Sequence, residues 1–435
     1  MNKKKIKIQG MKIKKPFLAK ILALMGGTAI SQVLIIASLP ILSRLYSPYD
    51  FGVLGAFTAY TSVLAPIACL CLASAILLPK EDKIAKLHLN TAFVTTITLS
   101  LTLLAFLIVI INVGFEIIEY ENDYWYISLM VAFVLFSGVQ QLLEKWFGRS
   151  EKFKALAKAN VAATFIMILS KVFGGILYPS SLILVITSST YPILYCLLIT
   201  KTSNTKIKSL KFTGLTLHKL RFSFFKNFDF VRYQAPQVLL SCLSQSIPIF
   251  ILGYFFSAEV VGFYAMARGI LSAPSMLIGK SVGDVFFPRM ARSALTDRNE
   301  MRRLFILSSS SLSIIGLPVF SIVLIFGGDI FSLVLGDKWF ISGEYASILS
   351  IWLYFAFLNS PSNQTLQIMG MQKYALKFTI GSLLIRSFCM LGAMWLNNDP
   401  EMLILCYALS GAFLNIYLIM SVYFKLSSWC TEAPK

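Results

Sequence analysis

The sequence contains little charge and very little acid. Only 14% of its residues are charged, and 20 Asp and Glu stand against 39 Lys and Arg, for a formal net charge of +19. Hydrophobic residues make up 57% of the chain, and its mean hydropathy is +0.74. This composition excludes an ordinary soluble globular domain, in which about 25% of residues are charged. We therefore expect most of the chain to be embedded in lipid.

Histidine and paired cysteines are also scarce. The two histidines, His88 and His218, fall in segments that we expect in the cytoplasm, and the seven cysteines are scattered without a CxxC pair. These absences argue against a metal centre, a disulfide framework and a hydrolytic triad. We expect no catalytic residues, no metal and no cofactor, and thus a protein that is not an enzyme.

Long apolar runs are what the sequence has in abundance. A helix needs about 20 apolar residues to cross the hydrocarbon core. Twelve windows of that kind lie at roughly 18–42, 51–78, 88–113, 125–143, 159–178, 180–200, 236–256, 258–287, 304–327, 344–368, 376–397 and 401–424. We expect an all-α polytopic membrane protein of about twelve transmembrane helices, with a tight hairpin at Pro179.

The basic residues lie mainly between the apolar windows, which argues against a nucleic-acid-binding surface. When the N-terminus is placed in the cytoplasm, 33 of the 39 Lys and Arg fall on the cytoplasmic side. Both termini are therefore expected on the cytoplasmic side of an inner membrane. Five of the six tryptophans fall near predicted helix ends, as interfacial aromatics should: Trp125, Trp146, Trp339, Trp395 and Trp429.

The two halves of the chain contain similar short sequence motifs. Ser47-Pro-Tyr-Asp-Phe-Gly52 follows the first window and Ser257-Ala-Glu-Val-Val-Gly262 follows the seventh, at an offset of 210 residues. Two pairs of prolines are separated by nearly the same number of residues. Pro40 and Pro248 are expected within helices one and seven, and Pro79 and Pro288 at the ends of helices two and eight. Six helices per repeat give both copies one topology, so we expect two six-helix bundles related by a pseudo-twofold axis around a central cavity.

This repeat sets the expected domain organisation. Residues 1–200 form an N-terminal bundle with a basic cytoplasmic N-terminus, 201–235 a cytoplasmic linker, and 236–435 a C-terminal bundle. The linker is basic and carries an aromatic stripe: Phe222, Phe224, Phe225, Phe228 and Phe230. It is predicted to be an amphipathic element on the inner leaflet, with a solvated linker as the alternative.

Six basic residues lie outside the expected cytoplasmic segments; Lys280, near the inner end of the eighth window, and Lys338, in an outer loop, are simply explained, and four remain. Arg268 and Arg386 lie close to the expected bilayer midplane, Lys171 somewhat beyond it, and Arg44 at the outer end of the first window. A lipid-facing Lys or Arg at the midplane costs roughly 2.5–3.5 kcal/mol. We expect these cations to face a hydrated cavity, with Lys171 and Arg386 on opposite walls, and to bind a phosphate or diphosphate head group. Pairing with carbonyls, hydroxyls or an acidic helix end is the alternative.

Acids at membrane depth are few. Asp50, Glu259 and Asp284 are the candidates for carrying a coupling ion, and the last two lie near the ends of the eighth window. Asp50 has a simpler explanation as a helix cap, because Ser47, Pro48 and Asp50 form a conventional helix start.

Several segments together resemble a known family. They are Gly27–Gln32, Leu39–Gly52, Ala75–Lys80, Val261–Arg268 and Leu335–Trp339. The resemblance is to the bacterial flippases of O-antigen and other lipid-linked oligosaccharides, in the polysaccharide transporter branch of the multidrug and oligosaccharidyl-lipid exporter superfamily. It covers helices one, two and eight and the loop before helix ten; elsewhere only the hydropathy agrees.

The resemblance implies an alternating-access carrier with a cationic central cavity. Such a carrier moves undecaprenyl diphosphate-linked sugar units from the inner to the outer leaflet, by antiport against protons or another cation, in lipopolysaccharide or related polysaccharide biosynthesis. The implied partners are this lipid-linked oligosaccharide, membrane lipid, and a polysaccharide polymerase with its chain-length machinery; nucleic acid is not expected.

Two alternatives belong to other classes. A multidrug exporter of the same superfamily would need acids in the cavity of the first bundle, and the first window has none. A surface-polysaccharide polymerase would need a large outer loop with catalytic residues, whereas the longest expected loop, 328–343, offers only Asp329 and Asp337.

Overall fold

The computed structural model describes residues 15–112, 123–203, 216–396 and 399–431, and these are helical almost throughout. The first half contains α1 (Lys15–Leu45), α2 (Pro48–Leu64), α3 (Asp82–Asn112), α4 (Asp123–Arg149), α5 (Phe153–Leu177), α6 (Ser181–Ser189) and α7 (Tyr191–Thr202). After α8 (Leu217–Lys226), the second half contains α9 (Ala235–Phe255), α10 (Ala258–Thr296), α11 (Arg298–Leu335), α12 (Phe340–Leu358), α13 (Ser360–Ile368), α14 (Gln372–Leu396) and α15 (Pro400–Thr431).

Within the described residues, eleven helical segments are long and apolar enough to cross a membrane. They match eleven of the twelve expected windows, with α6 and α7 sharing one span and α12 and α13 another. The remaining window, 258–287, falls in α10, where some side chains lie outside the described residues. The predicted all-α polytopic fold is confirmed, as is the hairpin at Pro179, which separates α5 from α6.

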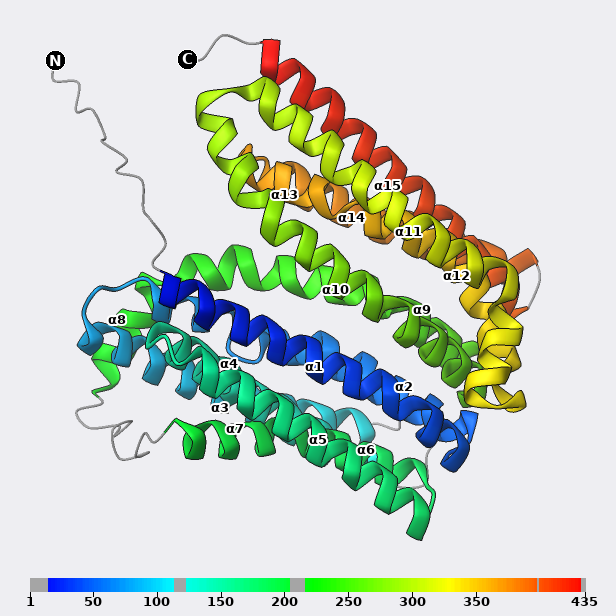
Figure 1. The fold of residues 1–435 in the computed structure, drawn as a ribbon. Coiled ribbons are helices and arrows are strands. Elements are labelled where there is room, and N and C mark those ends of the chain that lie inside the picture. Colours follow the sequence, from blue (N-terminus) through cyan, green and yellow to red (C-terminus); the bar gives the residue numbers. More distant parts are fainter. Residues whose placement is uncertain (1–14, 113–122, 204–215, 397–398, 432–435) are drawn as a thin grey trace, which may run out of the picture.

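The helices form two bundles, as expected (Figure 1). Helices α1 to α7 lie on one side, α11 to α15 on the other, and α9 and α10 lie between them. Helix α10 contacts both α2 and α12 and so joins the two halves. The bundles meet at the end where α2 begins, whereas at the opposite end the start of α11 and the end of α15 stand well away from α1 (Figure 1).

The repeated motif gives α2 and α10 the same start. Ser47 caps α2 with backbone angles φ −82° and ψ 163°, and Ser257 caps α10 with φ −84° and ψ 161°. In α2, Asp50 completes a capping box by accepting the Ser47 backbone N–H at 2.9 Å. The prolines Pro40 and Pro248 lie inside α1 and α9, as the offset indicates.

The two motif glycines lie at the contact between the halves. A Cβ placed on Gly52 would come within 1.7 Å of the Ala258 carbonyl oxygen, and one on Gly262 within 1.9 Å of the Pro48 carbonyl oxygen. Because Pro48 and Ala258 occupy the same place in the two motifs, this contact is reciprocal, as a pseudo-twofold axis requires. We call it the glycine junction; only glycine allows the two backbones to approach so closely.

Side chains beside the glycine junction bind the exposed carbonyls of helix ends. The Trp339 indole N–H donates to the Ser43 carbonyl at 3.1 Å, and the Lys338 ammonium donates to the Tyr46 carbonyl at 2.8 Å. In return, the Ser43 hydroxyl donates to the Leu335 carbonyl at 2.9 Å. These three hydrogen bonds, which we call the latch, link the end of α1 to the turn between α11 and α12.

The latch corrects two predictions. Trp339 is not an interfacial aromatic, because it is fully buried and contacts Phe51 edge to face at 5.2 Å between ring centroids. The predicted loop 328–343 is largely helical, since α11 continues to Leu335 and a short 3₁₀ turn follows. Likewise, Pro288 does not close the eighth helix but lies inside α10, which continues to Thr296.

The second span is interrupted after α2. Leu70 and Cys71 adopt left-handed backbone angles, with φ of 49° and 60°, between two 3₁₀ turns. Two α4 side chains bind carbonyls that this interruption frees. The Gln141 amide donates to the Ala65 carbonyl at 2.6 Å, and the Arg149 guanidinium binds the carbonyls of Ile76, Pro79 and Lys80 and the Asp82 carboxylate.

In the predicted linker, residues 204–215 lie outside the described residues, and α8 follows them. A buried polar cluster holds α8 against α3: His88 Nδ1 lies 2.8 Å from the Ser223 hydroxyl and 3.1 Å from the Asn227 amide. Phe222 and Phe225, from the predicted aromatic stripe, are exposed.

We predict that Gly262→Ala destabilises the protein by about 1–3 kcal/mol, because the new methyl group must push α2 away. Gly269→Ala is the matched control on the same helix, since a Cβ there meets nothing within 4 Å. Thermal unfolding in detergent should show a lower midpoint for Gly262→Ala and an unchanged or higher one for Gly269→Ala. Equal midpoints would contradict the close contact.

Candidate functional site

Arg386 of α14 is the most unusual charged group in the described residues. Its side chain is only 8% exposed, and its guanidinium carbon lies 5.1 Å from the Trp352 ring centroid and 5.3 Å from that of Tyr407. The Tyr407 hydroxyl lies 3.4 Å from one terminal nitrogen, and Nε has no hydrogen-bond partner in the structure. Among the described residues, no carboxylate lies within ion-pair distance of Arg386.

Two aromatic rings stabilise this cation without neutralising it. Cation–π contacts contribute up to about 2 kcal/mol when they are desolvated. Removing an ion from water costs several kcal/mol even after relaxation. The rings therefore offset only part of the desolvation cost, and the guanidinium keeps hydrogen-bonding capacity for an anion.

Arg268 of α10 belongs to the same region. Its guanidinium donates to the Gln245 carbonyl of α9 and lies 3.5 Å from the amide oxygen of the same residue. Arg268 and Arg386 are both close enough to the fully buried Tyr264 for their charges to act on its hydroxyl. The structure thus brings two of the four predicted cations together, around an aromatic group of Tyr264, Trp352 and Tyr407.

The other two predicted cations lie elsewhere. Arg44 is exposed in the last turn of α1, next to the latch. Lys171 is half-buried in α5, and its main-chain carbonyl accepts the Tyr46 hydroxyl at 2.7 Å. No contact in the described part of the chain joins either residue to the arginine pair.

The three predicted ion-coupling acids differ in their surroundings. Asp50 serves the capping box of α2, where its carboxylate accepts the Ser47 hydroxyl at 2.7 Å. Glu259 is exposed in the first turn of α10. The side chain of Asp284 lies outside the described residues.

The aromatic groups around Arg386 were not found from the sequence. Trp352, Tyr407 and Tyr264 lie on three different helices, α12, α15 and α10. Each of them resembles any other core aromatic in the sequence. In the sequence, only the predicted cation at membrane depth indicated a site around Arg386.

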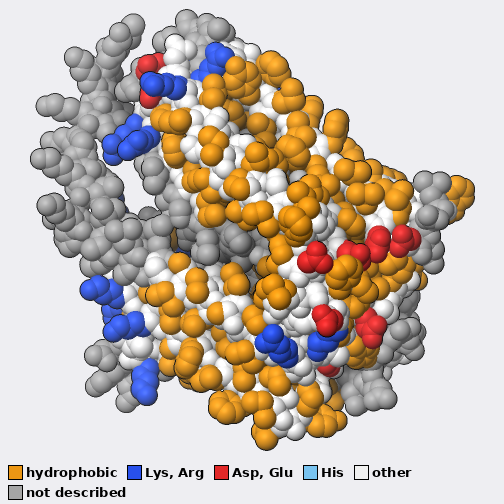
Figure 2. All heavy atoms as spheres, turned by 45° about the vertical axis from the view of Figure 1, so that its right-hand side comes forward, with side chains coloured by type: hydrophobic (Ala, Val, Ile, Leu, Met, Phe, Trp, Pro, Cys, Tyr) orange, Lys and Arg blue, Asp and Glu red, His pale blue; other side chains and the backbone are white. Residues whose placement is uncertain are grey.

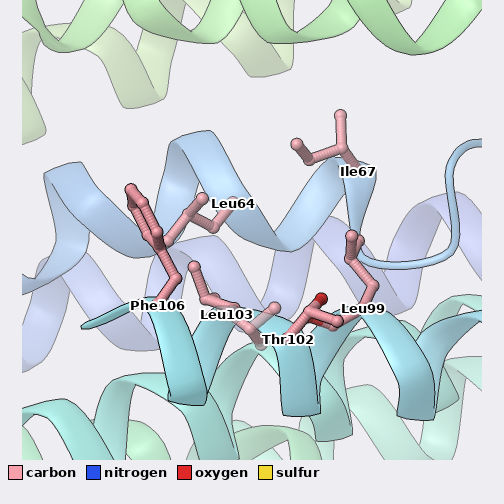
Figure 3. Close-up of a pocket in the computed structure, with 7 residues that line it drawn as sticks. Leu64, Ile67, Leu99, Thr102, Leu103 and Phe106 are labelled. Atoms are coloured by element: carbon pink, nitrogen blue, oxygen red, sulfur yellow. The ribbon is translucent and has the colours of Figure 1, made fainter. Parts of the chain in front are cut away.

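A pocket of about 280 Å³ lies between α2, α3 and α4 (Figure 3). Apolar side chains line it, including Leu64, Leu103 and Phe106, and Thr102 supplies its only hydroxyl. Since no charged residue lines this pocket, it cannot bind a phosphate head group. It is therefore distinct from the arginine site.

Charge on the surface is divided between the two ends of the bundles. Figure 2 shows many Lys and Arg side chains along one edge and most of the acidic side chains toward the opposite edge, where some basic side chains also lie, with a broad apolar surface between the two edges. Glu344, Asp399 and Glu401 lie close enough for their charges to act on one another. Such a division is typical of a protein that spans a membrane.

Two solved structures have the same fold over nearly the whole chain. One is described as the lipid II flippase MurJ in an inward closed conformation; it has a TM-score of 0.72 and 12% identity, and the match covers 94% of this chain and 90% of that one. The other is an inward-facing multidrug resistance MATE family transporter of the MOP superfamily, with a TM-score of 0.70, 14% identity and coverage of 92% and 96%. The fold is that of these MOP-superfamily proteins, and the chain is a multi-pass membrane protein.

The chain belongs to the family described as "Polysaccharide biosynthesis protein", which matches residues 41–344. A curated relative is the teichuronic acid biosynthesis protein TuaB of Bacillus subtilis (strain 168), 26% identical over 167 residues. That match covers 38% of this chain and spans only 34% of the relative. The expected resemblance is confirmed to this extent: the chain belongs to the polysaccharide biosynthesis proteins and has the fold of the MOP superfamily.

We predict that Arg386→Met leaves the thermal midpoint unchanged or raises it, because a buried cation without a carboxylate partner adds little to stability. Arg149→Met is the contrasting variant. It should lose about 3 kcal/mol, because it removes hydrogen bonds to three carbonyls and one carboxylate. A large loss in Arg386→Met would indicate a structural role for Arg386.

Proposed function

We propose that the protein is a flippase for undecaprenyl diphosphate-linked oligosaccharide, such as an O-antigen repeat unit. It moves this lipid from the inner to the outer leaflet of the bacterial inner membrane by alternating access. The observation that carries the proposal is the buried, unneutralised guanidinium of Arg386, with Arg268 nearby.

The chemistry of Arg386 suits a diphosphate. A guanidinium can donate two parallel hydrogen bonds to phosphate oxygens, which an ammonium cannot do. Anion binding would also supply the countercharge that the protein does not provide within the described residues. Trp352 and Tyr407 then limit the positions that the guanidinium can take.

The positions of the two ends support an inward-facing state. If the N-terminus is cytoplasmic, α2 and α10 begin at the outer surface, so the glycine junction and the latch close the outside. The acidic cluster of Glu344, Asp399 and Glu401 would then lie outside, as the positive-inside rule favours. The splayed end in Figure 1 faces the inner leaflet, from which the substrate comes.

Two sources of energy suit this direction of transport. The membrane potential, negative inside, favours outward movement of an anionic head by about 2.3 kcal/mol per charge per 100 mV. Coupling to a cation would add to this. A polysaccharide polymerase on the outer face is the natural next partner, because the translocated unit must be polymerised there.

The first competing proposal is export of cationic drugs. A cationic drug would meet two arginines at this site and no carboxylate within the described residues, which disfavours it. The second is a polymerase. A polymerase would need a large outer loop, and the longest one expected from the sequence, 328–343, is mostly helix, with Trp339 buried.

We expect Arg386→Ala and Arg268→Ala to lower surface polysaccharide strongly at normal protein levels. Loss of a charge-assisted contact of about 1.5–3 kcal/mol weakens head-group binding about 10- to 100-fold. Arg386→Lys should rescue only part of the loss, because an ammonium cannot replace the bidentate guanidinium. Arg303→Ala is the control, since Arg303 is exposed and pairs only loosely with Glu300 at 3.8 Å.

The experiment measures surface polysaccharide together with the leaflet position of lipid-linked intermediates, in cells that lack the protein and are complemented with each variant. Intermediates trapped on the inner leaflet support the flippase. Single repeat units that reach the outside unpolymerised would instead indicate a polymerase. Unchanged surface polysaccharide in all the arginine variants would refute the site.

A further inference from the structure

The N-terminal bundle contains a carboxyl group that neither the latch nor the arginine site uses. Glu144 lies in α4, half-buried, on a segment that spans the membrane. It is five residues before Arg149, where α4 ends, so it lies about one and a half helical turns below that end. The hydrogen bonds around it show what this carboxyl can do.

Neutral donors surround the Glu144 carboxyl. The Gln140 amide donates to one of its oxygens at 2.9 Å. Tyr195 of α7 is 3% exposed, and it lies close enough to the carboxyl for the two groups to affect each other's charge. An ionised carboxylate can only accept hydrogen bonds, whereas a protonated one also donates. The same pair can therefore serve both protonation states.

A second hydrogen-bonded pair, between α7 and α5, lies nearby. The Tyr191 hydroxyl, one helical turn before Tyr195, donates to the Asn160 side-chain oxygen at 2.6 Å. Tyr191 also feels the charge of Glu144. Polar groups from α4, α5 and α7, three helices of one bundle, thus lie in the neighbourhood of the Glu144 carboxyl.

The titratable groups that face Glu144 provide little positive charge. They are Lys145 on α4 itself, which is exposed, and Tyr191, Tyr195 and Cys196 on α7. Within the described residues, no Lys, Arg or His lies within ion-pair distance of the Glu144 carboxylate. A carboxyl group in such a place reaches neutrality by binding a proton rather than by forming an ion pair.

We propose that Glu144, hydrogen-bonded to Gln140 and adjacent to Tyr195, is a proton-binding site of the N-terminal bundle, and that the proton is the coupling ion. The second part rests on the proposed transport function, whereas the site itself does not. Protonation turns the carboxyl into a donor and rearranges the hydrogen bonds between α4 and α7. Because Glu144 lies only about one and a half helical turns from the end of α4, its proton can exchange with water there. That end is cytoplasmic in the proposed orientation.

The direct test is infrared spectroscopy on the full-length protein in nanodiscs of zwitterionic lipid. The spectrum of each variant is subtracted from that of the unsubstituted protein. At about pH 6, ordinary carboxyl groups are ionised. We expect a carbonyl band of a protonated carboxyl group that is absent in Glu144→Gln and shifted in frequency in Tyr195→Phe. Glu81→Gln, at an exposed glutamate before α3, should keep the band unchanged. A band that persists in Glu144→Gln would overturn the site.

Transport assays then test coupling separately. Glu144→Gln, which resembles the permanently protonated form, should lower surface polysaccharide at least tenfold, whereas Glu144→Asp should retain part of it. Full surface polysaccharide in Glu144→Gln, with the band lost, would overturn the coupling role. If the band is lost as expected but cells that lack the protein do not trap lipid-linked intermediates on the inner leaflet, the flippase assignment fails and the proton site stands.

Discussion

Hydrocarbon offers no hydrogen bonds, so every backbone polar group at membrane depth must find its partner inside the protein. This constraint accounts for much of the detail in the structure. Hydroxyls such as Thr61 and Thr96 donate to carbonyls four residues earlier in their own helices. Where the second span is interrupted, Gln141 and Arg149 bind the carbonyls that the missing helical turns release. Arg386 differs because no carboxylate among the described residues neutralises its charge.

Local signals made the fold predictable. Apolar windows gave the spans, and the Ser47 and Ser257 motifs gave the starts of α2 and α10, because caps and hydropathy depend on residues near one another in the chain. The offset between the halves also predicted a pseudo-twofold relation, and the glycine junction agrees with it. Trp339 was misread because a tryptophan near a helix end looks the same whether it faces lipid or a neighbouring helix.

The candidate site was predictable only in part. A cation in an apolar window pointed to Arg386 and Arg268, but nothing local indicated that Trp352 and Tyr407 enclose the first or that Lys171 lies apart. Those relations depend on how α12, α14 and α15 pack. Glu144 was missed because its position in the sequence gave no such signal. It belongs to the basic stretch at the end of α4, and only the packing of α7 against α4 shows that the carboxyl is half-buried.

In all three hydrogen bonds of the latch, the acceptor is a main-chain carbonyl oxygen near a helix end. In the proposed orientation, breaking it would expose those oxygens to the outer aqueous phase, where water can replace each lost partner at a net cost of about 0.5–1.5 kcal/mol. The rate at which the outer face opens would then depend on water activity. Excluded osmolytes such as sucrose, which disfavour hydration of newly exposed surface, should hold the carrier closed on that side.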